Sequence, residues 1–191
     1  ENTLLKTLTT QSWMTSLAIA IYSSGSGSVN YGARPFKYTA PSGYKSLNTA
    51  NLPEPTIADG SKYFDTKLFT GTGSTQALTM ANSALSPDFV WIKQRNTTRD
   101  NILFDVVRGA NEVLYSNTTT AEASYTNALN SFDSNGFTLG GNQLSNENNG
   151  TYAAWAWDAG SSTVSNTDGT ITSQVRANPS AGFSIVSFTG T

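Results

Sequence analysis

The chain has 191 residues, of which 13% are charged, and its formal net charge at pH 7 is -2. It contains no cysteine, which excludes disulfides and thiolate metal sites, and no histidine, which removes the commonest general base and the commonest transition-metal ligand. No run of Lys or Arg provides the electrostatic footprint of a nucleic-acid-binding protein, and the longest apolar run, Leu17 to Tyr22, is far too short to span a bilayer. We therefore predict no cofactor, no bound metal, no nucleic-acid partner and no membrane insertion.

The first third of the sequence changes character twice. Residues 17–22 alternate Leu or Ile with small Ala, which predicts a strand buried on both faces. A Ser/Gly turn follows at residues 23–28, and four prolines between residues 35 and 55 then exclude helix. Ser42-Gly43 predicts a tight turn. Pro53-Glu54-Pro55 is stiff and extended, as is typical of a domain boundary.

Strand signals then come at regular spacing, in residues 63–70, 87–95 and 101–109. The second is the strongest, because its residues separate into two faces that both begin apolar and end polar. Phe89, Trp91, Lys93 and Arg95 share one face, and Val90, Ile92 and Gln94 share the other. The polar stretch Asn96 to Asp100 predicts a hairpin loop between the second and third strands.

The second half carries turn signals between short strands. Asn135-Gly136 lies between Phe132 and Phe137 and predicts a hairpin, because both turn residues tolerate positive φ. Asp168-Gly169 predicts another, whereas residues 121–129 fit either a helical turn or a surface crossing. Many short strands with hardly a helix predict an all-β protein built from antiparallel β-sandwich modules in tandem.

Two stretches of the chain resemble each other. "YFDTKLFTGT" at residues 63–72 and "GFSIVSFTGT" at residues 182–191 agree at five of ten positions, with Phe64 matching Phe183 and Phe69 matching Phe188. Similarity at a fixed long period indicates a duplicated folding unit. Together with the first residue, Glu1, it leads us to expect a segment of a longer polypeptide.

The sequence also resembles known bacteriophage modules. "VNYGARPFKYTAPSGYKSLNTANLP", at residues 29–53, resembles the closing segment of SPRY-like modules in phage proteins. "SPDFVWIKQR", "LFDVVRGA", "SFDSNGFTLGG", "TYAAWAWDAG" and "AGFSIVSFTGT" resemble a repeated β-module that follows it in phage tail and virion proteins. The resemblance implies a jelly-roll or concanavalin-like sandwich in a phage particle, and it implies no catalytic residues.

These observations divide the chain into three parts. Residues 1–52 are expected to be the C-terminal part of a SPRY-like β module, and residues 53–160 a β-sandwich module. Residues 161–191 are expected to form a connecting hairpin and either the first strand of a further repeat or the closing strand of the second module.

Several side chains suggest sites, but a structural role is the simpler interpretation of each. Trp91, Trp155 and Trp157 fit core packing, with a sugar-stacking platform as the alternative. Asp133-Ser134-Asn135-Gly136 begins like a calcium loop, but the acidic ligand that an EF-hand needs at the twelfth loop position, counted from Asp133, is replaced by Leu144, which favours the hairpin. Asp105 and Arg108 predict an ion pair at the rim of a sheet.

The loops are the better candidates for recognition. Residues 96–100 and 142–149 join strands and carry side chains whose amides, carboxylate and guanidinium can hydrogen-bond hydroxyl groups. The candidate recognition residues are Arg99, Asp100, Gln143, Asn146 and Asn148.

The function that we predict is non-enzymatic. We expect a structural virion component, in a tail fibre or host-facing adhesin, that forms homo-oligomers, with a trimer favoured, and contacts other virion proteins and host surface glycans. The alternatives are a capsid decoration or adaptor protein and, more remotely, a polysaccharide depolymerase, which would need a pair of carboxylates that the sequence does not nominate.

Overall fold

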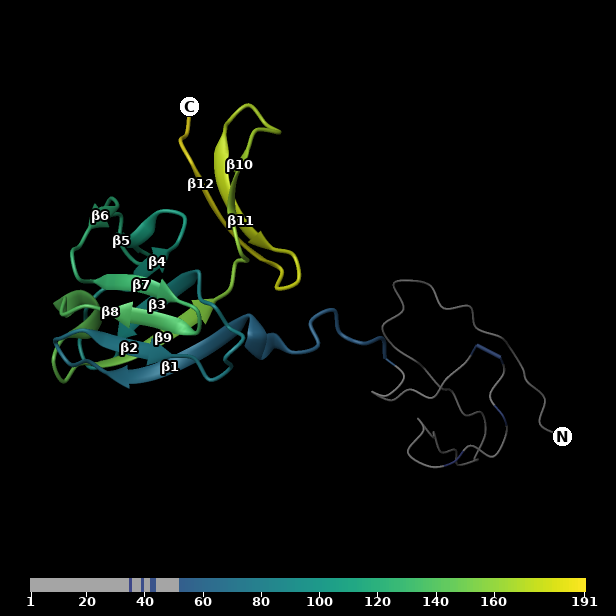
Figure 1. Cartoon of the computed structure of the whole chain (residues 1–191), viewed down its shortest axis with the longest axis horizontal. Coiled ribbons are helices and arrows are strands. Elements are labelled where there is room, and N and C mark those ends of the chain that lie inside the picture. The colour runs from purple at the N-terminus through teal and green to yellow at the C-terminus, as the bar shows by residue number, and fades with distance from the viewer. Residues whose placement is uncertain (1–34, 36–38, 40–41, 44–51) are drawn as a thin grey trace, which may run out of the picture. The chain divides into compact units, whose positions relative to one another are not determined.

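The computed structural model describes residues 52–191, together with Pro35, Thr39, Ser42 and Gly43 (Figure 1). Residues 54–191 form one compact unit, and residues 1–53 group separately. The predicted strand at residues 17–22 and the turn at residues 23–28 lie outside the described residues. Ser42 and Gly43 do form a turn, in which Gly43 has a φ of +86°.

The regular structure of the described residues is almost entirely β-strand, which confirms the all-β prediction. In this described part of the chain, helical structure is limited to a 3-10 turn, η2 (Gly60–Lys62), and a single α-helical turn, α1 (Gln143–Asn146). The strands are β1 (Phe64–Thr70), β2 (Gln76–Thr79), β3 (Phe89–Gln94), β4 (Ile102–Asp105), β5 (Gly109–Tyr115), β6 (Ala123–Ser124), β7 (Leu129–Asp133), β8 (Gly136–Leu139), β9 (Thr151–Trp157), β10 (Thr163–Asn166), β11 (Ser173–Asn178) and β12 (Phe183–Phe188).

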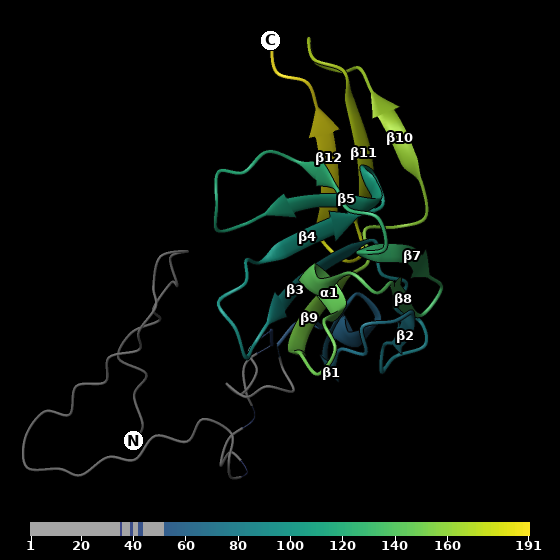
Figure 2. The ribbon, with the colours of Figure 1, turned by 90° about the vertical axis from the view of Figure 1, so that its left-hand side faces the viewer.

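The strands form three antiparallel sheets. A six-stranded sheet has the order β1-β9-β3-β4-β5-β6, and a three-stranded sheet has the order β2-β8-β7. Side chains from both sheets share one buried cluster, so the two sheets form a sandwich (Figure 1). The third sheet, β10-β11-β12, extends from the sandwich beyond β4 and β5 (Figure 2).

The core follows from alternation along β3 and β9. Val90, Ile92 and Gln94 are buried on one face of β3, as the sequence pattern predicts, and Tyr152, Ala154 and Ala156 are buried beside them on β9. These residues meet Leu78, Leu129, Phe137 and Leu139 of the second sheet. Each fully buried large apolar side chain stabilises the fold by about 1.5–3 kcal/mol.

The predicted hairpin between β7 and β8 is formed, but its two turn residues are Ser134 and Asn135, because Asp133 already pairs with Gly136. Gly136 has a φ of +149°, and a Cβ atom there would lie 2.0 Å from the carbonyl oxygen of Leu78, so only glycine fits. The carboxylate of Asp133 accepts hydrogen bonds from Ser131 and Thr138. The hairpin interpretation of residues 133–136 is therefore confirmed, and the described residues contain no group of three or more acidic side chains able to hold a metal.

The structure subdivides the predicted strand at residues 101–109. β4 ends at Asp105 and β5 begins at Gly109, because the chain turns between them. The Asp105 carboxylate accepts from the backbone N–H groups of Val107 and Arg108, and its Oδ2 lies 2.6 Å from Nε of Arg108. The predicted ion pair is thus confirmed, and its role is to close this turn. Residues 121–129 contain the two-residue strand β6 rather than a helical turn.

The third sheet packs against the outer face of the six-stranded sheet. The Phe183 ring of β12 lies with its centroid 6.0 Å from that of Phe89 and 5.9 Å from that of Trp157. Nη2 of Arg176 on β11 lies 2.7 Å from Oδ1 of Asp88 in the loop before β3. β10 and β11 pair as the predicted hairpin, and Asp168 and Gly169 lie in the longer loop between them, residues 167–172, rather than forming a two-residue turn. β12 therefore pairs with β11 and belongs to neither sheet of the sandwich.

Candidate functional site

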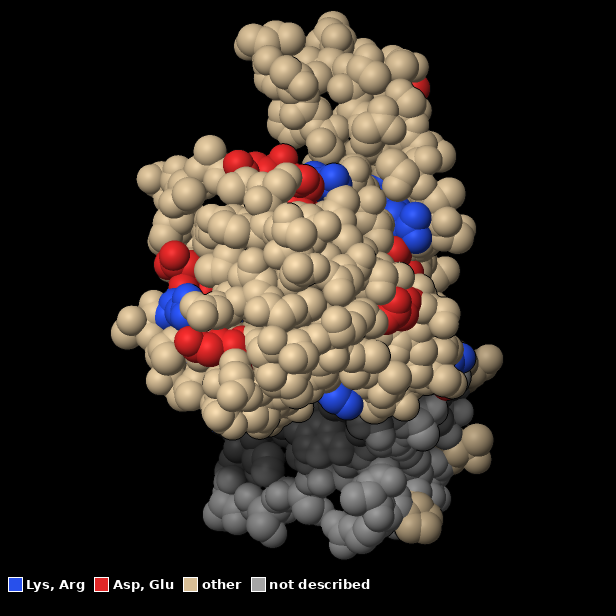
Figure 3. All heavy atoms as spheres, turned by 60° about the vertical axis from the view of Figure 1, so that its left-hand side comes forward, with Lys and Arg blue, Asp and Glu red and all other residues tan. Residues whose placement is uncertain are grey.

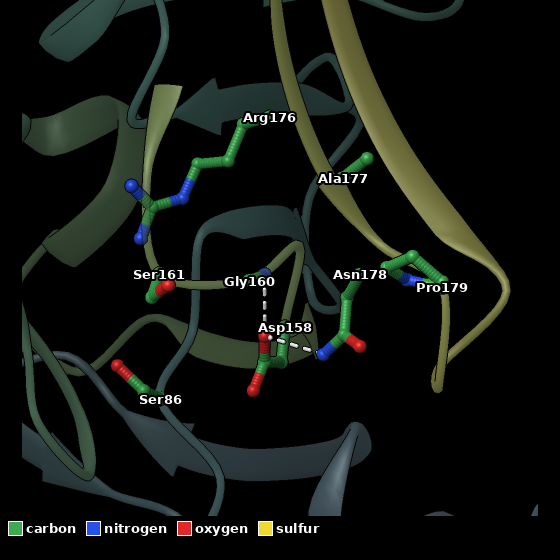
Figure 4. Close-up of a pocket in the computed structure, with 8 residues that line it drawn as sticks. All are labelled: Ser86, Asp158, Gly160, Ser161, Arg176, Ala177, Asn178 and Pro179. Atoms are coloured by element: carbon green, nitrogen blue, oxygen red, sulfur yellow. Dashed lines mark hydrogen bonds between the residues drawn. The ribbon is translucent and has the colours of Figure 1, made fainter. Parts of the chain in front are cut away.

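A polar hollow lies where the third sheet meets the sandwich, between the end of β9 and β11 (Figure 4). Its volume is about 600 Å³. In the view of Figure 4, Asp158 lies between Asn178 on one side and Ser161 and Ser86 on the other. The lining residues are Ser86, Asp158, Gly160, Ser161, Arg176, Ala177, Asn178 and Pro179.

Asp158 follows directly after β9 and is held rigidly. Its Oδ1 accepts from the backbone N–H of Gly160 at 2.6 Å and from Nδ2 of Asn178 at 3.0 Å. Gly160 has a φ of +100°, and a Cβ atom there would lie 2.6 Å from the carbonyl oxygen of Ala177, so this turn requires glycine. Both hydrogen bonds use the same carboxylate oxygen, which leaves Oδ2 to accept from a ligand.

Asn178 is fixed as firmly as Asp158. Its Oδ1 accepts from the backbone N–H groups of Ser180 and Ala181, at 3.1 and 3.2 Å, and so caps the turn between β11 and β12. The amide is thereby oriented with its Nδ2 toward Asp158. A preorganised polar group loses little conformational entropy when a ligand binds.

A buried ion pair holds one of the residues that line the hollow, Arg176. Asp88 is only 3% exposed; its Oδ1 lies 2.7 Å from Nη2 of Arg176, and its Oδ2 accepts from the backbone N–H of Ala159 at 2.9 Å. Burial raises the pKa of the Asp88 carboxyl above its ordinary value, against the opposing effect of the Arg176 hydrogen bond. The pair fixes Arg176 in the wall of the hollow.

The chemistry of the hollow suits a neutral, hydroxyl-rich ligand. Its groups are one carboxylate oxygen, the hydroxyls of Ser86 and Ser161 and the guanidinium of Arg176. A carboxylate accepts and a guanidinium donates, so vicinal hydroxyl groups can be bound from both sides. The second acid, Asp88, is buried with both oxygens already hydrogen-bonded, so Asp158 alone presents a carboxylate to the hollow.

The prediction that three tryptophans pack in the core is wrong. Trp91, Trp155 and Trp157 were predicted to pack in the core, but they lie on the opposite, half-buried face of the six-stranded sheet. The centroids of Trp91 and Trp155 are 5.7 Å apart, and Nε1 of Trp91 donates to Oδ1 of Asn101. Trp157 packs against Phe64, Phe89 and Phe183. The core between the two sheets is filled without them.

The structure brings the two predicted recognition loops together at one point. Nη2 of Arg99 lies 3.1 Å from Oε1 of Glu147, and Nε2 of Gln94 donates to the other oxygen of that carboxylate. These two hydrogen bonds, from Gln94 and then Arg99, lower the pKa of Glu147. Asp100 instead accepts from Asn117. Arg99 is therefore held by its neighbour loop through an acid that the sequence-based prediction did not include.

The remaining three candidates differ in exposure. Gln143 and Asn148 are exposed. Asn146 is fully buried: its Oδ1 accepts from the backbone N–H of Thr72, and its Nδ2 donates to the carbonyl oxygens of Ser74 and Gly140. The amide of Asn146 is thus committed to holding three chain segments together and has no capacity left for a ligand.

Sequence reasoning missed the hollow because its members come from distant segments. Asp158 and Asn178 are 20 residues apart and meet only through the turn of the third sheet. Asp-Ala-Gly at residues 158–160 is a local signal for a side-chain-capped turn, but the partner strand is set by tertiary packing.

One face of the molecule carries little charge. Figure 3 shows one face of the molecule, on which Lys, Arg, Asp and Glu side chains are few and separated by broad uncharged areas. No helix in the described part of the chain has the length and apolar character needed to cross a membrane.

The chain belongs to a family described as a domain of unknown function, DUF7483, whose model matches residues 59–191. The matched range includes every described strand and the whole hollow. No curated protein and no solved structure matches the chain.

Proposed function

We propose that this member of the DUF7483 family is a non-enzymatic structural component of a bacteriophage virion, in a tail fibre or related host-facing appendage, and that it binds host surface glycans in the hollow around Asp158. The observation that carries the glycan proposal is the rigid arrangement of Asp158, held by Gly160 and Asn178, beside the hydroxyls of Ser86 and Ser161 and the guanidinium of Arg176. Fixed hydrogen-bonding groups in a polar hollow are suited to sugar hydroxyls.

The placement in a phage particle has separate support. It comes from the resemblance of residues 29–191 to SPRY-like and repeated β-modules of phage tail and virion proteins. The proposed work of this chain is that of a rigid stalk or an attachment head, whose weak individual contacts gain strength when several copies bind at once. We propose that the protein forms a homo-oligomer, with a trimer as the favoured state. Sedimentation velocity measures the size of this oligomer directly.

A glycan array and a cell-binding assay test the adhesin proposal. The fluorescently labelled protein is applied to the array and to host cells, and binding that free glycan competes away is expected. If the protein binds no glycan and no host cell at any accessible concentration, the glycan proposal is wrong and a purely scaffolding role replaces it.

Exposed apolar side chains favour a second candidate, a capsid decoration or adaptor protein. Leu68 on β1 is 65% exposed, and Val164, Val186 and Phe188 of the third sheet are at least 50% exposed. Such side chains suit contacts between virion proteins. A reconstruction of the particle distinguishes the two candidates, because density on the tail supports the appendage and density on the shell supports the decoration protein.

The remote alternative is a polysaccharide depolymerase. Hydrolysis of a glycosidic bond ordinarily requires two carboxyl groups facing the substrate. Incubation with host polysaccharide followed by a reducing-end assay tests it directly, and release of new reducing ends would replace the non-enzymatic proposal.

A further inference from the structure

We propose that β12 and the three residues after it form the start of a second module of the same kind, whose β9-type strand pairs with the free edge of β12 and whose core covers Phe188. This inference concerns how modules join and does not depend on glycan binding. It rests on a comparison of β12 with β1, the two strands that share the Phe-Thr-Gly-Thr ending.

In β1 the second phenylalanine of the shared sequence is partly buried and packs against the core. Phe69 pairs in register with Tyr152 of β9, and their rings are stacked with centroids 5.0 Å apart and an interplanar angle of 10°. Tyr152 is fully buried, and Phe69 packs against the core cluster. The phenylalanine at this position thus seals the end of the sandwich.

The equivalent residue of β12 has no such role. Phe188 is 64% exposed, and Val186, two residues before it on the same face, is 50% exposed. Val186 pairs with Val175, which pairs with Val164, so an apolar row crosses the outer face of the third sheet. The inner face of β12 contacts the sandwich through Phe183. Residues 185–188 of β12 also line a hollow together with Asp105, Arg108, Leu114 and Glu122.

The glycine of the shared ending supports the same comparison. A Cβ atom on Gly71 would lie 2.2 Å from the carbonyl oxygen of Glu147, and its N–H donates to the carbonyl oxygen of Gly150. The following residue, Thr72, donates its N–H to Asn146. A Cβ atom on Gly190 would meet nothing within 4 Å. The turn between α1 and β9 therefore requires glycine at position 71, whereas nothing in the described residues requires it at position 190.

Strand pairing leaves room for the proposed neighbour. β12 is an edge strand that pairs with β11 alone among the described strands, and β1 is an edge strand that pairs with β9 alone. A β9-type strand on the free edge of β12 would place a tyrosine opposite Phe188, as Tyr152 lies opposite Phe69. The glycine of the ending would then meet an α1-type turn. A second copy of this module therefore matches the unused features of β12.

An extended chain tests the proposal. It carries a second copy of residues 73–160 directly after Thr191, so that residues 182–191 precede this copy as residues 63–72 precede the first. We expect the appended copy to resist limited proteolysis and to unfold cooperatively. In the extended chain, Phe188→Ala should remove the protection of the appended copy only.

The 191-residue chain provides a matched pair of variants. Phe69→Ala should lower the Tm by about 10 °C, since it removes an aromatic ring that packs against the core, whereas Phe188→Ala should shift it by less than about 2 °C. Equal losses from the two variants would overturn the proposal, because Phe188 would then stabilise this module.

A control distinguishes two reasons for a lack of protection: that residues 182–191 cannot serve as the first strand, or that the appended copy cannot fold in this position at all. A second extended chain carries residues 63–160, with their own first strand, after a Gly/Ser linker. Protection of this copy without protection of the copy that begins at residue 73 would overturn the proposal. If neither copy is protected, a further variant tests the proposal: the 191-residue chain in which GFSIVSFTGT replaces residues 63–72. Cooperative unfolding of this variant supports the proposal, and loss of cooperative unfolding overturns it. None of these readouts involves a glycan, so they are independent of the adhesin proposal.

Discussion

Nη2 of Arg176 lies 2.7 Å from Oδ1 of Asp88, and this contact ties the third sheet to the sandwich. Because Asp88 is 3% exposed, removal of its partner leaves a buried charge without a cation. We expect Arg176→Met to lower the free energy of unfolding by about 3–5 kcal/mol, measured by urea denaturation. The double variant Asp88→Asn/Arg176→Met should recover most of this loss. A single variant as stable as the unmodified protein would show that the pair contributes nothing to the fold.

The same acid predicts a pH dependence. Burial raises the pKa of Asp88 above its ordinary value of 3.8, so between 3.8 and the raised value the folded protein binds more protons than the unfolded chain. The contribution of this group to stability is therefore fully present below pH 3.8 and is lost as the pH rises through the pKa of the folded state. Urea titrations across this range should show that the unmodified protein becomes less stable relative to Asp88→Asn as the pH rises. A difference that moves the other way would contradict the direction of the shift.

The alternation of side chains predicted the faces of β3 but not the environment of β9. Trp155 and Trp157 alternate with Ala154 and Ala156, and either set is apolar enough to be buried. The alanines face the core, where small side chains leave space for Phe137 and other large residues of the second sheet. Period-two patterns identify which residues share a face, whereas the choice between two apolar faces depends on the opposing layer.

The turns were predicted better than the site. The Asn135-Gly136 pair allowed the β7–β8 hairpin to be identified from a few residues, although only Gly136 has a positive φ and the turn itself lies one residue earlier, at Ser134 and Asn135. The hollow depends on Asp88, Asp158 and Arg176, which come from three separate segments, and no local rule places them together. The candidate Asn146 has the right chemistry for recognition, but only the fold reveals that its amide is buried.

Asn146 should act on stability rather than on binding. Asn146→Ala removes the partners of Thr72 N–H and of the Ser74 and Gly140 carbonyls, and buried groups left unpaired cost about 1–3 kcal/mol each. We expect a loss of at least about 3 kcal/mol by urea denaturation, with Asn148→Ala, at an exposed position two residues on, as the control that changes stability by less than about 0.5 kcal/mol. Equal behaviour of the two variants would contradict the structural role of Asn146.

Tyr115 should make the protein sensitive to alkali. Burial, together with a hydrogen bond between its hydroxyl and that of Tyr125 at 3.1 Å, raises the pKa of Tyr115 to about 12. The unfolded chain ionises this residue near pH 10, so stability is lost as the pH rises from about 10 to about 12. Thermal melts over this range should show a smaller pH dependence for Tyr115→Phe. An unchanged dependence would mean that Tyr115 ionises equally in both states.

Asp158 provides the sharpest test of the glycan proposal. Asp158→Asn retains an oxygen that accepts from Gly160 and Asn178, so the fold of the hollow should persist and the Tm should change little. It removes the charge with which Oδ2 would accept from a sugar hydroxyl, and hydrogen bonds to charged groups contribute about 1.5–3 kcal/mol. We expect glycan binding to weaken by about tenfold or more, measured on the array by titration. Asp168→Asn, in the exposed turn between β10 and β11, carries the same chemical change away from the hollow and should bind like the unmodified protein. If Asp158→Asn binds glycan as tightly as the unmodified protein, the glycan site lies elsewhere on the module.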